Sequence, residues 1–260
     1  MASKTPSSDQ PKIKLYWLNQ SRSQRILWLL EELKVDYELE IIHRLPSKHA
    51  PPELKKVHAL GKSPVLTILP PGATEPVVLA ESAFIMEYLL DHFAHESTLL
   101  PTRWKAGQEN TLCGETEEWT RFRYYMHYAE GSLMPYLIVA LIMSMIDSPN
   151  LPFFIRPITG MITGKVRSTF LEPNFNTHFT FLNEQIQTSP SGGKYLCGEH
   201  LTGADILMSF PLVAAKQRAG LTKEKYPELF AYVERLENED GYKRAVEKIV
   251  EIEGEFQAIQ

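Results

Sequence analysis

Residues 13–33, IKLYWLNQSRSQRILWLLEEL, decide the fold of this chain. Residues 13–18 are rich in apolar and aromatic side chains, which predicts a strand, and the polar turn at residues 19–22 follows it. Within residues 23–33 the apolar side chains stand at positions 26, 27, 29, 30 and 33, which is the spacing of a buried helix. The chain therefore opens with a strand, a tight turn and a helix.

The segments that follow complete a small α/β domain. Residues 37–42 alternate as a strand does, and residues 52–57 form one or two helical turns. The remaining elements are a hairpin with strands at 65–69 and 77–80 around the turn PPGATEP, and a helix at 82–93. The order βαβαββα, with a right-handed crossover between the first two strands, predicts a thioredoxin-like domain over residues 12–93.

The second half of the chain is predicted to be helical. A polar connector with a proline occupies residues 94–104, and a helical period then continues almost to the end. The candidate helices cover residues 105–130, 132–147, 154–170, 174–188, 204–219, 227–238 and 240–254. We therefore expect an all-α domain over residues 105–254, and a disordered polar tail at residues 1–11.

Composition excludes several classes of protein. The net charge is −5 and no block of lysine or arginine stands out, so nucleic acid is not an expected partner. The two cysteines lie far apart and the eight histidines lack a ligand spacing, so we expect neither a disulfide nor a metal site.

Two apolar features bear on location. The tail lacks the apolar stretch of a signal peptide, which favours a cytoplasmic protein. The longest apolar run, residues 133–146, is shorter than the ~20 residues that a membrane-spanning helix needs. We interpret this run as a buried core helix and expect no transmembrane segment; contact with a membrane surface is the alternative.

Ser21 lies in the turn between the first strand and the first helix. Backbone N–H groups and the positive end of the helix dipole converge there, which suits an anion. The structural alternative is a capping box in which Ser21 and Gln24 only start the helix. For a thiol ligand the hydroxyl outweighs the dipole, because a hydrogen bond to a charged group is worth about one to two pKa units and the dipole less than one.

Two further turns carry groups that suit a peptide-like ligand. In GKSPV, a cis Ser63–Pro64 bond would turn the backbone of Ser63 outward to pair with an extended peptide; an ordinary trans proline at a sheet edge is the alternative. Ser82 opens a helix and can offer its hydroxyl and N–H groups to a carboxylate, while Glu81 can meet an ammonium group. Simple N-capping by Ser82 is the structural alternative.

Taken in order, these motifs resemble those of glutathione transferases. SRSQR follows the first strand, GKSPVL opens the third, and AESAFI opens the last helix of the first domain. LTGADILMSFPL resembles the capping motif of the family's C-terminal domain, with Thr202 as the N-cap and Asp205 as its partner. The segments WLNQSRSQRILWLL, APPELKK and EGSLMP are similar to the fungal, yeast-type branch, and the resemblance covers about residues 12–250.

The resemblance implies that glutathione is the co-substrate and that Ser21 hydrogen-bonds its thiolate. The backbone of Ser63, before cis Pro64, would pair with the cysteinyl part of glutathione. The chain departs from the family at Ser63, where a larger aliphatic residue is common. Tyr16 and Asn19 are alternative partners of the thiolate.

The remaining roles also come from the resemblance. Glu81 and Ser82 would hold the γ-glutamyl end of glutathione, and His49 and Lys62 would approach its glycine carboxylate. The family likeness further implies a homodimer.

A tyrosine stripe on the predicted helix 105–130 is the candidate second-substrate pocket. Arg121, Tyr124, Tyr125 and Tyr128 fall at helical spacing, and the resemblance implies that they face the glutathione sulfur; an ordinary core stripe is the alternative. The expected reaction is attack of the thiolate on a small apolar electrophile. A peroxidase or isomerase using the same site, and a non-catalytic interaction module, are the alternative functions.

Overall fold

The computed structural model describes residues 10–95, 97–148 and 151–259, so most of the predicted tail at residues 1–11 lies outside the described residues. The chain divides into two compact units, Met1–Ser97 together with Glu239–Gln260, and Thr98–Asn238. The expected helical domain at residues 105–254 differs from this division in its last helix, which belongs to the first unit.

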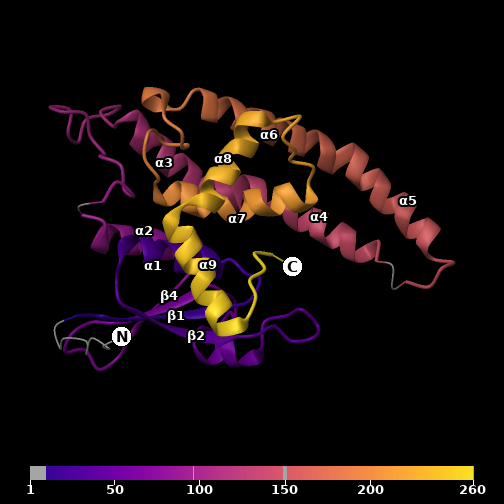
Figure 1. Ribbon diagram of the computed structural model, residues 1–260, viewed down its shortest axis with the longest axis horizontal. Coiled ribbons are helices and arrows are strands. Elements are labelled where there is room, and N and C mark those ends of the chain that lie inside the picture. Colours follow the sequence, from indigo (N-terminus) through magenta and orange to yellow (C-terminus); the bar gives the residue numbers. More distant parts are fainter. Residues whose placement is uncertain (1–9, 96, 149–150, 260) are drawn as a thin grey trace. The chain divides into compact units, whose positions relative to one another are not determined.

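A mixed four-stranded sheet forms the centre of the first unit (Figure 1). β1 (Lys12–Leu18) pairs in parallel with β2 (Tyr37–Ile42) and antiparallel with β3 (Val65–Leu69), which pairs antiparallel with β4 (Val77–Ala80). The strand order is β2-β1-β3-β4. The predicted βαβ unit and hairpin are therefore confirmed.

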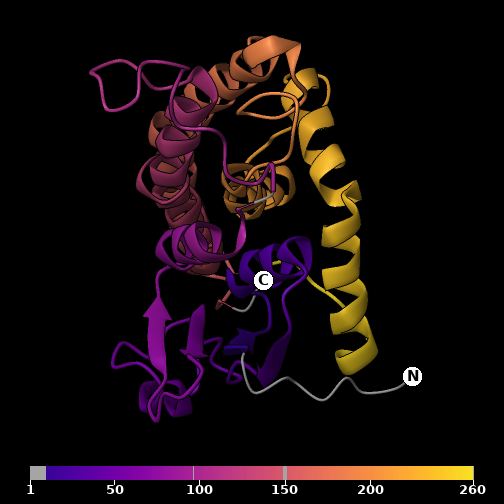
Figure 2. The same cartoon turned by 90° about the vertical axis from the view of Figure 1, so that its left-hand side faces the viewer.

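Helices cover both faces of this sheet (Figures 1 and 2). α1 (Ser23–Leu33) and α2 (Ser82–Phe93) lie on one face, and the short 3-10 helix η1 (Pro52–Lys56) lies on the other. Residues 23–30 of α1 are all buried, because α1 is packed both on the sheet and against the C-terminal helix α9 (Asp240–Glu253).

The packing of α1 on α9 centres on Trp28, which is completely buried. Its ring meets the ring of Tyr242 edge to face, with centroids 5.2 Å apart, and its indole N–H donates to Glu32 Oε1 at 2.9 Å. Gly241 leaves room for Glu32, since a Cβ at position 241 would lie 2.0 Å from that oxygen. α9 therefore packs alongside α1 within the first unit (Figure 2).

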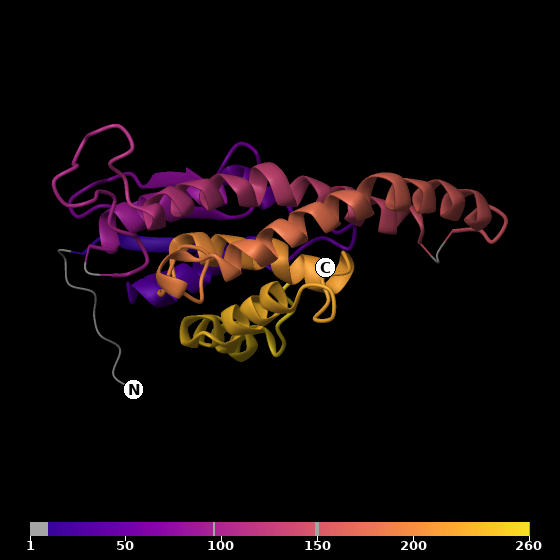
Figure 3. The ribbon, with the colours of Figure 1, turned by 90° about the horizontal axis from the view of Figure 1, so that it is seen from above.

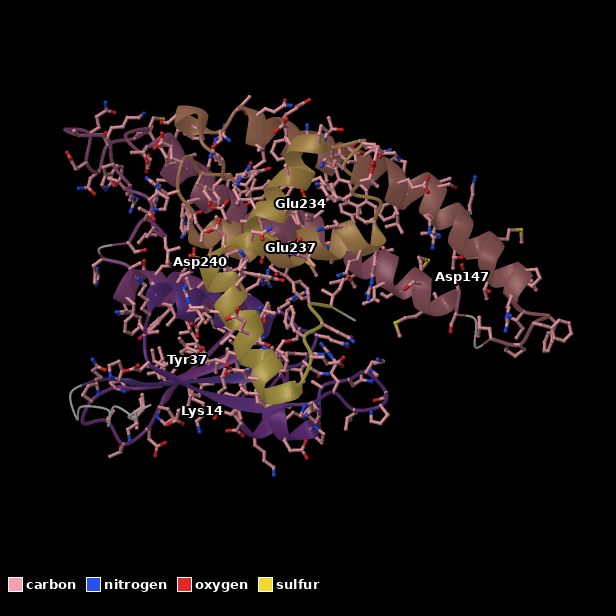
Figure 4. All side chains as sticks on the ribbon, in the orientation of Figure 1. Lys14, Tyr37, Asp147, Glu234, Glu237 and Asp240 are labelled. Atoms are coloured by element: carbon pink, nitrogen blue, oxygen red, sulfur yellow. The ribbon has the colours of Figure 1, made fainter. Side chains whose placement is uncertain are left out.

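A polar cluster adds to this packing at the level of β2. Lys248 of α9 donates to Tyr37 Oη at 2.7 Å and to Glu31 Oε1 at 3.0 Å. Tyr37, which is labelled in Figure 4, donates to the same Glu31 oxygen. Burial raises the pKa of Tyr37, so this hydroxyl stays protonated and available as a donor.

The second unit is built from helices. They are α3 (Glu117–Tyr128), α4 (Met134–Ile146), α5 (Arg156–Val166), α6 (Glu172–Gln187), α7 (Gly203–Arg218) and α8 (Pro227–Asn238), with a 3-10 turn, η4, at Pro190–Gly192. α7 is the core helix, since most of its side chains are buried and it packs against α3, α4 and α8. It begins with the predicted capping box between Thr202 and Asp205.

Two π-helical segments interrupt the long helices of this unit. η2 (Ala129–Leu133) lies just before Pro135, and η3 (Arg167–Leu171) lies just before Pro173. A proline inside a helix has no N–H to donate and crowds the preceding turn, and a π-helical turn is one way to accommodate it. The helices therefore continue where the sequence alone predicts a break.

The first predicted helix of the second unit starts later than expected. Residues 105–116 form a loop in which Trp104 and Glu115 make an isolated bridge, and Asn110 and Cys113 have positive φ. α3 begins at Glu117, where the Thr116 hydroxyl accepts a hydrogen bond from the N–H of Trp119. The turn and capping residues thus outweigh the apolar periodicity in this stretch.

The apolar run at residues 133–146 is not a buried core helix. Within α4 only Met134 and Leu137 are buried, and large apolar side chains are exposed along α4 and α5. In the second unit the two helices extend past the end of α7 (Figure 3).

The helix that contains this run, residues 117–146, is long and apolar enough to cross a membrane, and 22% of its most apolar stretch is buried. This criterion uses length and composition only, which a core helix also satisfies.

Candidate functional site

Three serine hydroxyls meet at the C-terminal end of β1. Ser21 Oγ lies 2.7 Å from Ser23 Oγ and 3.2 Å from Ser63 Oγ. It donates to the carbonyl of Leu18 at 2.7 Å and accepts the backbone N–H of Ser23 at 3.1 Å. Ser21 and Ser23 are buried and Ser63 is half-buried, so Ser63 is the most accessible of the three.

The capping-box interpretation of Ser21 is wrong. α1 begins at Ser23 with Arg22, not Ser21, as its N-cap, and the Arg22 side chain makes no capping hydrogen bond. Both polar atoms of the Gln24 side chain are buried without a hydrogen-bond partner among the described residues. The Ser21 hydroxyl instead joins the turn to Ser63, a residue 42 positions later.

The Ser63–Pro64 peptide bond is cis, so the trans alternative for the GKSPV motif is wrong, and pairing of the Ser63 backbone with an extended peptide stays a prediction. Pro64 is buried and lies directly before β3. Lys62, which precedes Ser63, is exposed. The Ser63 side chain lies at the turn that carries Ser21.

Among the residues that the structure describes, neither of the two alternative thiolate partners, Tyr16 and Asn19, hydrogen-bonds to the three serines. Tyr16 stands on the sheet face that carries Lys14, Glu38 and Glu40, because side chains alternate along β1 and its neighbour β2. Asn19 uses its side-chain oxygen to accept the N–H of Arg44 at 2.9 Å. The Arg44 side chain also donates to the carbonyls of Asn19 and Gln20, so Arg44 fixes the start of the turn.

A second polar group lies where β4 leads into α2. Ser82 is the first residue of α2 and is buried, and its hydroxyl accepts a hydrogen bond from Arg25 Nη2 at 2.9 Å. It is therefore not the N-cap; Glu81 holds that position, with an exposed side chain and φ of 71°. Positive φ is strained for a residue other than glycine, and such strain is common at ligand sites.

His49 lies away from the serine cluster along the chain, in an exposed loop. Its Nδ1 contacts Ser47 Oγ at 3.3 Å, and its carbonyl accepts the N–H of Leu45. Within the part of the chain that the structure describes, no hydrogen bond joins His49 to Lys62 or to the three serines.

The predicted tyrosine stripe separates into a cavity wall and a core residue. Tyr124 and Tyr128 line an open cavity of about 450 Å³ together with Arg123, His127, Gly131 and Ser132. Tyr125 is completely buried, does not line this cavity, and donates to Gln185 Oε1 at 3.2 Å. Tyr124 and Tyr125 are adjacent in one helix and cannot share a face, so helical spacing alone predicts too many tyrosines in the pocket.

Tyr128 is held by His178. Its hydroxyl lies 2.5 Å from His178 Nδ1. Burial raises the pKa of Tyr128 and lowers the pKa of His178, which favours a neutral phenol beside a neutral imidazole. His178 also lines a second cavity of about 360 Å³, with Pro135, Tyr136 and Phe170 among its other walls.

Arg121 is a clamp within the second unit. Its guanidinium donates to the carbonyls of Gln185, Thr188 and Leu196, and it also contacts Glu117. It does not line the cavity beside Tyr124. Within the described ranges, no group of three or more acidic, histidine or cysteine residues could hold a metal ion.

Comparison with known proteins identifies the family. Residues 21–92 match the model of the glutathione S-transferase N-terminal domain, and residues 162–248 match that of the C-terminal domain. Glutathione S-transferase 1 of Saccharomyces cerevisiae is 35% identical over 238 residues, which cover 92% of this chain and 95% of that protein. The chain belongs to the glutathione S-transferase family.

Other members of the family agree in sequence and fold. Glutathione S-transferase 3 of Schizosaccharomyces pombe is 31% identical, covering 91% of this chain and 88% of that protein. The crystal structure of a glutathione S-transferase from Actinobacillus pleuropneumoniae has 31% identity and a TM-score of 0.64, covering 91% of this chain and 92% of that one. A glutathione transferase from Phanerochaete chrysosporium, solved with oxidised glutathione, shares the fold at 16% identity and a TM-score of 0.66, covering 97% and 99% of the two chains.

Members of this family use glutathione as co-substrate, so the polar groups of the first unit are compared below with the chemistry of glutathione. Two residues of this glutathione S-transferase that hydrogen-bond the candidate site residues, Ser23 and Arg25, were missed from sequence. Both stand in the SRSQR motif, as its second serine and its last arginine, so the motif itself was the sequence signal that could have indicated them. Their partners, Ser21 and Ser82, show that one motif supports both polar groups of the site.

Proposed function

We propose that this glutathione S-transferase joins the glutathione thiolate to small apolar electrophiles, and that the Ser21 hydroxyl stabilises the thiolate. The observation that carries the proposal is the contact of Ser21 with Ser63 beside a cis proline. This contact puts a hydroxyl donor next to a backbone segment that can pair with an extended peptide.

Glutathione has three polar ends, and the first unit has groups of matching chemistry. Ser82 can donate to the γ-glutamyl carboxylate, and the positive charge of Arg25 behind it favours an anion. The exposed carboxylate of Glu81 suits the ammonium group of the same end. We assign the glycine carboxylate to Lys62 and His49, because both are exposed and Lys62 directly precedes Ser63.

The second substrate is assigned to the cavity beside Tyr124 and Tyr128. The aromatic rings provide an apolar wall, and Arg123, His127 and Ser132 add polar groups. The reaction needs no covalent enzyme intermediate: the thiolate sulfur forms the new bond, and the leaving group departs with the electron pair. We also assign the protein to the cytoplasm and to a homodimer, as the family resemblance implies.

An isomerase using the same site has one specific support. A relative 24% identical over 240 residues bears the name maleylacetoacetate isomerase, from Aspergillus fumigatus. Both reactions begin with the same thiolate, so the assignment of Ser21 holds for either.

The test is conjugation of glutathione to an aryl halide, measured against pH for the wild type and Ser21→Ala. A hydrogen bond to a charged group contributes about 1.5–3 kcal/mol, which corresponds to one to two pKa units of the bound thiol. We expect Ser21→Ala to be at least about tenfold slower at neutral pH. The two rates should converge above the thiol pKa of the variant, because the thiolate then forms without help.

Glutathione affinity is measured separately by retention on immobilised glutathione and by calorimetry. Ser168→Ala, at an exposed serine of the other unit, is the matched control and should behave as the wild type. An unchanged pH profile for Ser21→Ala would assign the thiolate to another donor. A wild type that does not bind glutathione would favour the interaction-module alternative.

A further inference from the structure

We propose that the Ser63 hydroxyl is a second donor to the glutathione thiolate, so that two serines share its charge. This inference rests on the proposed function and goes beyond it in one respect. The resemblance gives Ser63 only a backbone role, whereas the contacts of its side chain point to the reacting sulfur.

The first step of the argument concerns the proton of Ser21. A hydroxyl has one proton, and the shortest acceptor available to Ser21 Oγ is the Leu18 carbonyl at 2.7 Å. To donate to a thiolate, Ser21 must turn this proton away from Leu18. Ser23 can replace it there, because Ser23 Oγ already donates to the same carbonyl at 3.1 Å. Ser23 is therefore a positioning residue.

The second step concerns the proton of Ser63. The only hydrogen-bond partner of the Ser63 hydroxyl among the described residues is Ser21 Oγ, 3.2 Å away. Ser21 Oγ also receives the Ser23 N–H, and this bond remains while the Ser23 hydroxyl donates to Leu18. The Ser63 proton can therefore leave Ser21 without leaving an unsatisfied buried group, which makes it the less costly of the two donors.

The third step concerns position. Two oxygens 3.2 Å apart can both lie within hydrogen-bond distance of one ligand atom. Ser63 is half-buried where Ser21 is buried, so the pair presents one sheltered and one accessible donor. Donors that are already in place before charge develops stabilise an anion without reorganisation.

The experiment compares Ser63→Val with Ser63→Thr. Valine and threonine have the same β-branched shape, and only threonine keeps a hydroxyl, so the pair isolates the hydrogen bond. The readouts are the pKa of bound glutathione, followed by the ultraviolet absorbance of the thiolate, and the pH profile of conjugation. We expect Ser63→Val to raise the thiol pKa by about one unit and to slow conjugation about tenfold at neutral pH.

Ser63→Thr should stay close to the wild type in both readouts, and the two variants should have equal rates above the thiol pKa. Equal thiol pKa values for wild type, Ser63→Val and Ser63→Thr, all with glutathione bound, would overturn this inference and leave the proposed function intact. If the wild type itself binds no glutathione, the proposed function and this inference both fail. Loss of glutathione binding in Ser63→Val and Ser63→Thr alike would show that position 63 acts through its shape, which also overturns the inference.

Discussion

Asp205→Ala should lower the free energy of unfolding by about 3 kcal/mol or more, because one hydrogen bond to a charged group contributes about 1.5–3 kcal/mol and several are lost together. The Asp205 carboxylate is fully buried and accepts four hydrogen bonds: from the N–H groups of Leu196 and Thr202, and from the hydroxyls of Thr202 and Tyr232. Burial raises its pKa, and these hydrogen bonds act against that rise. Alanine would leave four donors in the core without an acceptor.

Denaturant unfolding at neutral pH measures this loss. Tyr232→Phe removes one of the four donors and keeps the acceptor, so it should lower the free energy of unfolding by no more than about 3 kcal/mol. Asp240→Ala, at an exposed position of α9, is the matched control and should stay within about 1 kcal/mol of the wild type. A loss for Asp205→Ala no larger than that of the control would contradict the view that this carboxylate holds α7, α8 and the 196–202 turn together.

Trp28→Ala is expected to cost a similar amount, about 3–5 kcal/mol, since replacing a buried Trp by Ala leaves a large cavity. The ring fills the space between α1 and α9 and hydrogen-bonds Glu32. The same helix starts two residues after Ser21, so we also expect weaker glutathione binding.

Two milder variants separate the parts of this effect. Glu32→Gln keeps an acceptor for the indole N–H and should cost less than about 1 kcal/mol. Gly241→Ala should cost about 1 kcal/mol or less, because its Cβ would displace only the flexible end of the Glu32 side chain, and alanine favours the helix over glycine. If Trp28→Ala unfolds at the denaturant concentration of the wild type, the packing against α9 contributes nothing to the first unit.

Local patterns were enough to predict most elements of the first unit. The alternation in residues 37–42, the apolar spacing in residues 23–33 and the turn PPGATEP each predict an element that the structure contains. The capping box at Thr202 was predicted for the same reason, since both partners lie within one turn of helix. Such features depend on neighbours in the chain, and a sequence displays neighbours directly.

The errors came where distant residues compete for a side chain. The structural alternative for Ser21 pairs it with Gln24, but Ser21 pairs with Ser23 and Ser63. The run at residues 133–146 is as apolar as a core helix, yet burial depends on what packs against it, and little of α4 is covered. Tyr125 shares its spacing with the pocket tyrosines and is nonetheless core.

What the sequence by itself determined is the order of elements, the positions of the polar turns and the family. Local hydrogen bonding and periodicity specify the elements and the turns, and the motifs that they carry indicate the family. Only the tertiary structure decided that Ser63 meets Ser21, that Arg25 supports Ser82, and that α9 packs on α1. Each of these interactions joins residues more than 40 positions apart, and the sheet and the helix packing, not the local chain, bring them within a few ångströms of each other.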